Sequence, residues 1–437
     1  MVYKIGMGTA MALCLSAVIG DTLFVITGVP IAQAGSDSII AFIVVGILTI
    51  VIALQFGELG SMMPGQKGVG YSYITRAFGS ELGFIAGILL FISFCAIAAA
   101  ITFSFGGYLL SMLGLQGQLQ QIAVAAMLIL IISVLNMYGI REAAALSKPL
   151  IAITLLAAAV FVAYAIAYNM QHDHLASNFV NLATQNGIPP FVQAATTIVF
   201  AYTGFQMVTT FTNNIKGKGR KMAKVLLYSI ALGMIAYLAV DVGLLALVPA
   251  RNSVISSQPL LYALEYASAP EYVIVVVGVG TLIAIAAATI ATIYGASRLI
   301  YQIGVDGLLP RVATIYDKRD DVAVGGVWIS MIVSILMLFS GNLYQIVSIS
   351  NFGIIFSWIM VCASVISLRR RRSRGTFSAP LYPVLPVIGI VSCMIFLLGL
   401  PRESLAIGVS IILALLIIFY TIVEIRYREV SRIKLFD

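Results

Sequence analysis

The feature that most constrains this chain is a series of long apolar segments that recurs along its whole length of 437 residues. A helix needs about 20 mostly apolar residues to cross the hydrocarbon core of a bilayer, and such a helix satisfies its backbone hydrogen bonds internally. The segments of this kind, which we number spans 1 to 12, lie to within a few residues at 6–33, 38–63, 82–112, 119–138, 147–168, 188–213, 222–249, 271–303, 323–340, 343–368, 383–400 and 404–425. The sequence therefore predicts an all-α integral membrane protein with twelve transmembrane helices.

The composition fits a protein with little chain outside the bilayer. Only 10% of the residues are charged and the mean hydropathy is +1.06, whereas water-soluble domains carry about 25% charged residues. The net charge is +8, but the basic residues lie in short loops between spans and form no basic domain. These properties exclude most classes of soluble enzyme and give no reason to expect a nucleic acid as partner.

The basic residues also predict the orientation, because Lys and Arg are enriched in cytoplasmic loops. With the N-terminus in the cytoplasm, 23 of the 25 Lys and Arg residues fall on the cytoplasmic side, and only Arg251 and Arg402 fall on the other. We interpret span 1 as a transmembrane helix and not as a signal peptide, because its apolar run exceeds the roughly 7–15 residues of a signal-peptide core. We therefore expect a multi-pass protein of the cytoplasmic membrane with both termini in the cytoplasm.

Residues that build metal centres or catalytic sites are scarce. The four cysteines lie in apolar segments without a CxxC pair, so they are expected to be small buried hydrophobes. His172 and His174 flank Asp173 in one loop that contains no further Cys or His. No HExxH pair or phosphate-binding loop occurs. We expect no enzyme activity, no metal site and no cofactor, with a coupling proton or cation left open.

Two spans contain groups that weaken a transmembrane helix near its centre. Span 1 has Gly20, Asp21 and Thr22 in mid-segment, and span 6 has Gly204 between two aromatic residues. A helix in the bilayer is interrupted only where other groups satisfy its freed backbone. Breaks at corresponding points five spans apart are typical of transporters built from inverted repeats. The sequence therefore predicts discontinuous helices in spans 1 and 6.

A broken helix has binding chemistry of its own. Free N–H groups at the start of one half attract a carboxylate, and free C=O groups at the end of the other half attract a cation or ammonium, so an amino acid can use both. The alternative for a single glycine is close packing against a neighbouring helix. The predicted substrate-binding residues are Ile19, Gly20, Asp21, Thr22, Phe200, Ala201, Tyr202, Thr203 and Gly204, and the predicted gating residues are Phe205 and Gln206.

Four motifs resemble those of the amino acid–polyamine–organocation (APC) superfamily of secondary transporters, in the same order and at the same spans. They are Gly57-Glu58-Leu59-Gly60 through Pro64 to Ala77-Phe78-Gly79, then Phe200-Ala201-Tyr202-Thr203-Gly204-Phe205, then Gly295-Ala296-Ser297-Arg298 with Asp306-Gly307-Leu308-Leu309-Pro310, and finally Ala379-Pro380-Leu381-Tyr382-Pro383. The resemblance implies the five-plus-five inverted repeat called the LeuT fold, with alternating access around spans 1 and 6. It divides the chain into a first repeat at 1–168, a second at 188–368, and spans 11 and 12 with a tail at 369–437.

Departures from the family's pattern leave the coupling mechanism open. Many members have Gly-x-Gly at the first break, where this chain has Gly20-Asp21-Thr22. Many carry a glutamate, implicated in acid sensing or proton handling, where this chain has Gln206, which cannot titrate. Some carry a lysine in span 5 that is taken to replace a sodium ion, where this chain has Thr154, with Thr289 opposite in span 8. The candidates for coupling are Asp21, Thr154 and Thr289.

Asp21 allows three interpretations. A charge at mid-bilayer is costly, so such a residue usually faces a cavity or a partner. An ionised Asp21 would contact a substrate amine or a cation, and a protonated one would carry the coupling proton. The third interpretation is that Asp21 caps the second half of the broken helix. For Asp241, the other acidic residue well inside a span, we expect a hydrogen-bonded structural role.

The function predicted from these observations is secondary active transport of an amino acid or a related amine across the cytoplasmic membrane. One alternative is a polyamine or organic-cation exchanger, which the carboxylate at the first break would suit. Another is a sensor that keeps the fold without transporting. The expected partners are a small-molecule substrate and the lipid bilayer, and the oligomeric state is left open.

Overall fold

The computed structural model describes residues 7–20, 22–63, 68–138, 140–172, 188–206, 218–253, 255–317, 319, 321–340, 342–373 and 375–433. This part of the chain is almost entirely helical, and its β pairing is limited to one isolated bridge between Asp317 and Val322. The helices are α1 (Met7–Ile19), α2 (Thr22–Val25), α3 (Gly28–Ala34), α4 (Ser38–Met62), α5 (Val69–Phe78), α6 (Ser80–Met112), α7 (Gln118–Asn136), α8 (Ile140–His172), α10 (Ile188–Ala201), α11 (Lys218–Leu247), α12 (Pro259–Tyr266), α13 (Glu271–Val305), α14 (Val324–Leu338), α15 (Leu343–Arg370), α16 (Val384–Leu398) and α17 (Arg402–Ile433). Short 3-10 turns lie at η1 (Gly35–Asp37), η3 (Ala250–Asn252) and η4 (Arg311–Thr314).

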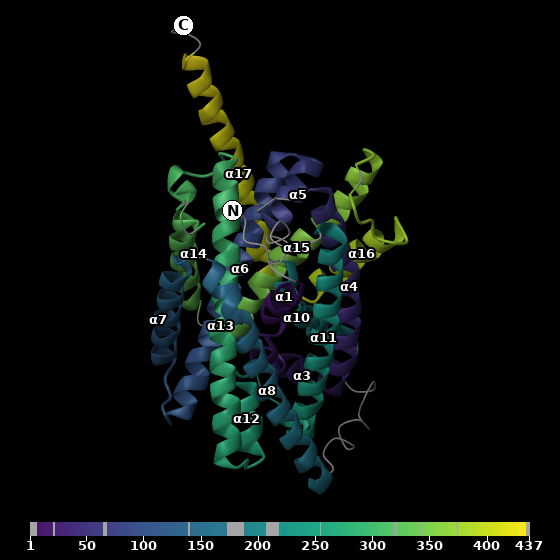
Figure 1. Ribbon diagram of the computed structural model, residues 1–437, viewed down its shortest axis with the longest axis vertical. Coiled ribbons are helices and arrows are strands. Elements are labelled where there is room, and N and C mark those ends of the chain that lie inside the picture. The colour runs from purple at the N-terminus through teal and green to yellow at the C-terminus, as the bar shows by residue number, and fades with distance from the viewer. Residues whose placement is uncertain are drawn as a thin grey trace.

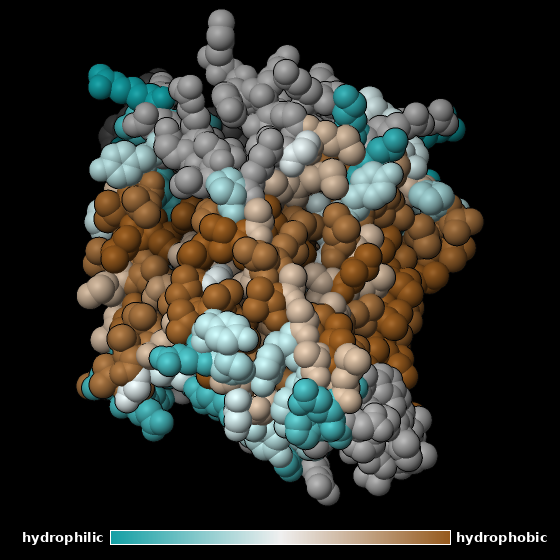
Figure 2. All heavy atoms as spheres, turned by 60° about the horizontal axis from the view of Figure 1, so that its bottom comes forward, coloured by the Kyte–Doolittle hydropathy of each residue, from teal (hydrophilic) through white to brown (hydrophobic). Residues whose placement is uncertain are grey.

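The helices have the length and surface of a membrane protein. Eight stretches of the described chain are long and apolar enough to cross a bilayer, and shorter apolar helices lie at Val324–Leu338 and Val384–Leu398. Figure 2 shows a broad hydrophobic band across the visible face, with hydrophilic residues gathered above and below it. Large apolar side chains are exposed in many of these helices, for example Ile47, Leu130 and Leu398. A surface of this kind is stable against lipid and not against water.

The long helices run side by side along the longest axis of the molecule (Figure 1). The short helix α5 and the C-terminal end of α17 lie at one end of the bundle, and α12 lies at the other. The helix α6 is buried along most of its length and packs against α13 and α15. The core of the molecule is therefore a helix bundle whose central members contact protein on all sides.

Spans 1 and 6 are interrupted at the positions that the sequence predicts. Span 1 forms three pieces, since α1 ends at Ile19, α2 begins at Thr22 and α3 begins at Gly28. In span 6, α10 ends at Ala201, and residues 203–206 form a 3-10 turn. Glycine, threonine and tyrosine are weaker helix formers than alanine or leucine. An interruption of the helix at these residues therefore costs little in intrinsic helix stability.

The two interrupted spans lie in the interior, where they pack on each other and on the long helices α4 and α11. The helix α11 packs along both α4 and α1, and α10 packs against α3 and α4. Gly233 of α11 allows this approach, because a Cβ atom at that position would lie 2.9 Å from Cγ1 of Val18. The two breaks are thereby held next to each other and next to α11.

Candidate functional site

The two helix breaks meet in direct backbone contact. Gly204 lies so close to α1 that a Cβ atom placed on it would be 1.6 Å from the carbonyl oxygen of Ala17. The alternative interpretation of this glycine, close packing against a neighbouring helix, is therefore correct for Gly204. The close packing also serves the site, because it brings the end of α10 to the end of α1.

At the end of α10, hydroxyl groups replace the missing helix donors. The last carbonyls of a helix lack the N–H groups of a following turn. The carbonyl of Phe200 accepts a hydrogen bond from Oγ1 of Thr203 at 2.8 Å. The carbonyl oxygen of Ala201 lies within hydrogen-bonding distance of two hydroxyls, at 3.1 Å from Oγ1 of Thr22 and at 2.7 Å from the hydroxyl of Tyr237. The C-terminal end of α10 is thus satisfied by side chains, two of which come from other spans.

The end of α1 is satisfied by the same two hydroxyls. The carbonyl oxygen of Val18 likewise lies 2.9 Å from Oγ1 of Thr22 and in contact with the hydroxyl of Tyr237. The hydroxyl oxygens of Thr22 and Tyr237 also contact each other. The N–H of Gly20 completes this end by donating to the carbonyl of Ser16 at 3.0 Å. Two carbonyls from two broken helices therefore converge on one pair of hydroxyls.

Tyr237 is fixed in this position by its surroundings. It belongs to α11 and has no exposed surface. Its ring stacks on Phe42 with the centroids 5.5 Å apart, and it meets the ring of Tyr202 edge-on at 5.2 Å. The hydroxyl of Tyr202 donates to the carbonyl of Phe42 at 3.1 Å. The predicted site residue Tyr202 therefore supports the position of Tyr237.

The predicted gating residues lie on the other side of the span 6 break. The ring of Phe205 contacts Phe56 of α4 edge-on at 5.4 Å and Trp358 of α15 at 5.7 Å. The indole N–H of Trp358 donates to Oε1 of Gln206 at 2.7 Å. All four side chains are buried. The segment after the break is thus held between α4 and α15 by aromatic contacts and one buried hydrogen bond.

Of the three coupling candidates, the structure describes only Thr154 and Thr289. Asp21 lies outside the described residues. Thr154 and Thr289 are buried, and each donates to a carbonyl of its own helix, that of Leu150 at 2.9 Å and that of Ile285 at 2.8 Å. Threonine commonly satisfies its hydroxyl in this way within an apolar helix. Among the described residues, no group of three or more His, Cys, Asp or Glu side chains is suited to hold a metal ion.

Asp241 lies one helical turn after Tyr237 on α11. It is fully buried, and its Oδ2 accepts a hydrogen bond from Oγ of Ser38 at 2.9 Å. Ser38 is the first residue of α4. This contact fixes the start of α4 against α11, in keeping with the hydrogen-bonded role expected for Asp241.

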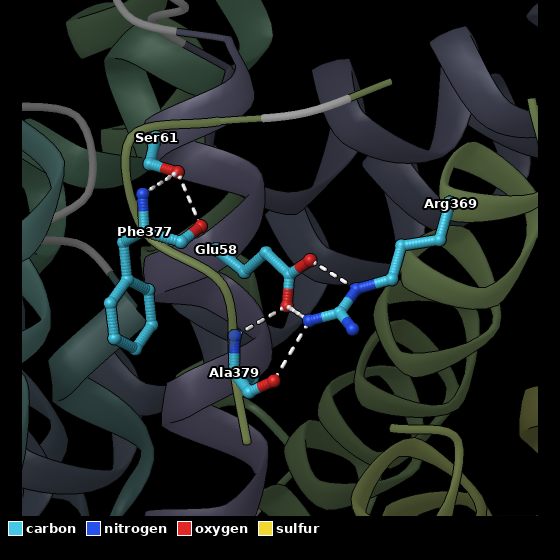
Figure 3. Close-up of polar contacts among 5 residues, drawn as sticks. All are labelled: Glu58, Ser61, Arg369, Phe377 and Ala379. Atoms are coloured by element: carbon cyan, nitrogen blue, oxygen red, sulfur yellow. Dashed lines mark hydrogen bonds and ion pairs between the residues drawn. The ribbon is translucent and has the colours of Figure 1, made fainter. Parts of the chain in front are cut away.

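A second buried polar cluster joins three segments near the end of the bundle where α5 lies (Figure 3). Glu58 of α4 has no exposed side-chain surface and pairs in two-pronged fashion with Arg369 of α15, at 2.5 Å to Nε and 2.7 Å to Nη2. Arg369 and Glu58 also bind the backbone of Ala379, each at 2.8 Å. Ser61 binds both the N–H and the carbonyl of Phe377, at 3.1 and 2.9 Å. We call these five residues the Glu58 clamp.

The loop that follows α13 is fastened at the same end of the molecule. Burial raises the pKa of Tyr71 in α5, and the adjacent Asp306 raises it further, so the phenol stays protonated and donates to Oδ2 of Asp306 at 2.6 Å. Arg298 at the end of α13 pairs with Asp321 at 2.9 Å and donates to the hydroxyl of Tyr316 at 3.1 Å. The motifs around Glu58, Arg298 and Asp306 thus supply structural contacts away from the helix breaks.

Tyr237 is the main member of the site that the sequence did not single out. Tyrosines are common in membrane proteins, and nothing in the local sequence shows which carbonyl a hydroxyl will reach. One signal was present, since Tyr237 and Asp241 are four residues apart and so place two polar groups on one face of an apolar helix.

The chain is similar to known proteins along most of its length. Residues 9–432 match the family model described as amino acid permease. The chain is 26% identical to the methylthioribose transporter of Bacillus subtilis (strain 168), over 89% of this chain and 86% of that protein. It is also similar to two proteins named branched-chain amino acid permease BcaP. Identity is 22% to that of B. subtilis (strain 168), over 88% of this chain and 85% of the relative, and 24% to that of Lactococcus lactis subsp. cremoris (strain MG1363), over 90% and 89%.

Proposed function

Because this chain belongs to the amino acid permease family, we propose that it is a secondary active transporter that moves an amino acid or a related amine across the cytoplasmic membrane. The substrate binds between the broken centres of spans 1 and 6, and alternating access exposes it to one side of the membrane at a time. The twelve spans, the two inverted repeats at 1–168 and 188–368, and the cytoplasmic position of both termini are parts of this proposal.

The observation that carries the proposal is the convergence of the Val18 and Ala201 carbonyls on one point. Each is the acceptor end of a broken helix, and each lies within hydrogen-bonding distance of the same two hydroxyls. Acceptors at the C-terminal ends of helices favour a positive charge. A primary ammonium has three N–H donors, so it can bind both carbonyls at once.

The same breaks supply the mobility that alternating access requires. A continuous transmembrane helix moves as one rod, whereas two halves joined by an irregular segment can tilt separately. Span 1 has such joints between Ile19 and Thr22 and again before Gly28. The half-helix α1 packs on α11, α8 and α13, so tilting of α1 would open a path from the site to one side of the membrane.

Uptake by reconstituted protein tests the proposed function. Radiolabelled leucine, lysine and methylthioribose are offered separately to proteoliposomes, and each is challenged with unlabelled leucine, lysine, putrescine and methylthioribose. The proposal expects saturable uptake of leucine or lysine. Methylthioribose as the only transported compound would contradict an amine as the recognised group. Binding of an amine without net flux would favour the sensor, and preferential competition by putrescine would favour the polyamine or organic-cation exchanger.

The role of Asp21 is tested by Asp21→Asn, with uptake measured between pH 5 and pH 8. Loss of the pH dependence with uptake retained indicates that Asp21 carries the coupling proton. Loss of uptake at every pH indicates contact with the amine or a cation. Unchanged uptake and unchanged pH dependence would leave the capping role alone.

A further inference from the structure

The hydroxyl of Tyr237 occupies the point between the two broken helices at which a substrate amine is expected. It donates to the carbonyl of Ala201 at 2.7 Å and also contacts the carbonyl of Val18 and Oγ1 of Thr22. Tyr237, Val18 and Ala201 have no exposed surface, and Thr22 is 2% exposed. The two hydroxyl protons of Tyr237 and Thr22 match the two helix-end carbonyls, so each acceptor can receive one bond.

A carrier must also change sides when no substrate is bound, unless it works only by exchange. When it closes without substrate, water leaves the helix ends, and a buried carbonyl without a donor is costly. A bound ammonium removes that cost while substrate is carried. On the return without substrate, another donor has to take its place, and Tyr237 and Thr22 are in position to do so.

Resting on the proposed function, we propose that the hydroxyl of Tyr237 stands in for the substrate amine whenever the carrier closes without substrate. Two consequences follow. Tyr237 allows the unloaded carrier to change sides and therefore supports net transport as well as exchange. Tyr237 also competes with the substrate amine for the carbonyls of Val18 and Ala201, so it lowers the affinity for that amine.

Cys14 provides a readout that needs no substrate. It is buried on α1, four residues before Val18 and on the same face of the helix. Cys95, Cys362 and Cys393 are the other cysteines, and all are buried. In a background in which these three are replaced by alanine, the rate of Cys14 labelling by N-ethylmaleimide reports how often α1 moves away from its neighbours.

Tyr237→Phe in this background is the test, because it keeps the ring and removes only the donor. Without substrate we expect Cys14 to be labelled about tenfold faster than in the background protein, since closure now leaves a carbonyl without its bond. The control is Tyr164→Phe, which removes a hydroxyl bonded to the carbonyl of Ala267 at 3.4 Å, away from the breaks. We expect this control to label at the background rate. Equal rates for Tyr237→Phe and the background would overturn the proposal.

Adding leucine or lysine separates this proposal from the one on which it rests. An amine that binds the two carbonyls restores the missing donor, so it should slow labelling of Tyr237→Phe toward the background rate and bind this variant more tightly than the unchanged protein. If labelling accelerates but neither compound slows it, the role of the Tyr237 hydroxyl holds and the amine assigned under the proposed function is wrong.

Transport provides a second measurement that a damaged fold would not imitate. With leucine or lysine, whichever is taken up, we expect Tyr237→Phe to reduce net uptake into unloaded vesicles about tenfold. Uptake into vesicles preloaded with the same unlabelled compound should fall much less, since both directions then carry an amine. An equal reduction of net uptake and exchange would show a general defect and overturn the proposal.

Discussion

Gly204 is the residue whose size most directly determines whether the two breaks can meet. Its Cα lies against the backbone of α1, and a methyl group there would be 1.6 Å from the carbonyl oxygen of Ala17. The obstructing atom belongs to the backbone, so it cannot move aside as a flexible side chain would. Spans 1 and 6 would have to separate, which would pull Ala201 away from Thr22.

Gly204→Ala is therefore expected to be severe. Inserting a methyl group into a well-packed core costs about 1–3 kcal/mol and sometimes more. Because the added Cβ would lie so close to a backbone oxygen, we expect the free-energy cost at Gly204 to reach or exceed the upper value of this range. We expect a lower midpoint of thermal unfolding and loss of amine uptake. Gly8→Ala is the matched control, because a Cβ at Gly8 would meet nothing within 4 Å. A stable, active Gly204→Ala protein would show that the breaks need not touch.

At the same scale, the sequence predicted which residues would lie at the breaks but not which atoms would satisfy them. Gly20, Thr22 and Gly204 were identifiable because glycines with polar neighbours lie near the middle of two apolar spans, at corresponding points five spans apart. Tyr237 was not, because it lies 215 residues from Thr22 and its own span carries no break. The hydrogen-bond partner of a freed carbonyl depends on how the helices pack, and this packing could not be predicted from the single sequence.

At the scale of helices, the long elements could be predicted and the short ones could not. Each predicted span contains at least one observed helix, because burial in lipid requires an apolar segment of fixed length. The helices α5 (Val69–Phe78) and α12 (Pro259–Tyr266) lie between spans and were not predicted as helices. They are short, and they are stabilised by packing on long helices such as α6 and α13.

The Glu58 clamp joins elements that are distant in the sequence, namely α4, the end of α15 and the segment that leads to α16. Removing one member of a buried ion pair leaves the other charge unpaired and costs about 3–5 kcal/mol. Glu58 has no exposed side-chain surface, while that of Arg369 is 20% exposed. Loss of the arginine should therefore be the more damaging change, since the stranded carboxylate has no access to water.

Arg369→Gln should lower the midpoint of thermal unfolding more than Glu58→Gln, and the double variant should recover part of the loss because no charge is left unpaired. Thermal unfolding of the four proteins of this cycle provides the measurement, with Arg370→Gln as a control on an exposed neighbouring arginine. Additive effects of the two single changes would show that Glu58 and Arg369 do not act as a pair.

For the whole molecule, the proposed topology makes a prediction about the two ends of the helix bundle. α5 and the C-terminal end of α17 lie at the same end of the bundle, and α12 lies at the opposite end (Figure 1). The positive-inside rule assigns the end with α5 to the cytoplasm. In the proposed topology, Arg251 and Arg402 are the two basic residues of the sequence that belong to the other side.

Cysteine accessibility in intact cells tests this topology. In a cysteine-free background, a cysteine at Ser256, before α12, should react with a membrane-impermeant maleimide. A cysteine at Ser373, after α15, should react only after the cells are opened. The opposite pattern would invert the orientation, and reaction at both positions in intact cells would contradict the number of spans between them.

The most direct test of the whole account is an experimental structure with the transported amino acid or amine bound. We expect the ammonium group within hydrogen-bonding distance of the carbonyl oxygens of Val18 and Ala201, with the Tyr237 hydroxyl displaced from at least one of them. Substrate bound elsewhere, with both carbonyls still bonded to Thr22 and Tyr237, would contradict the account.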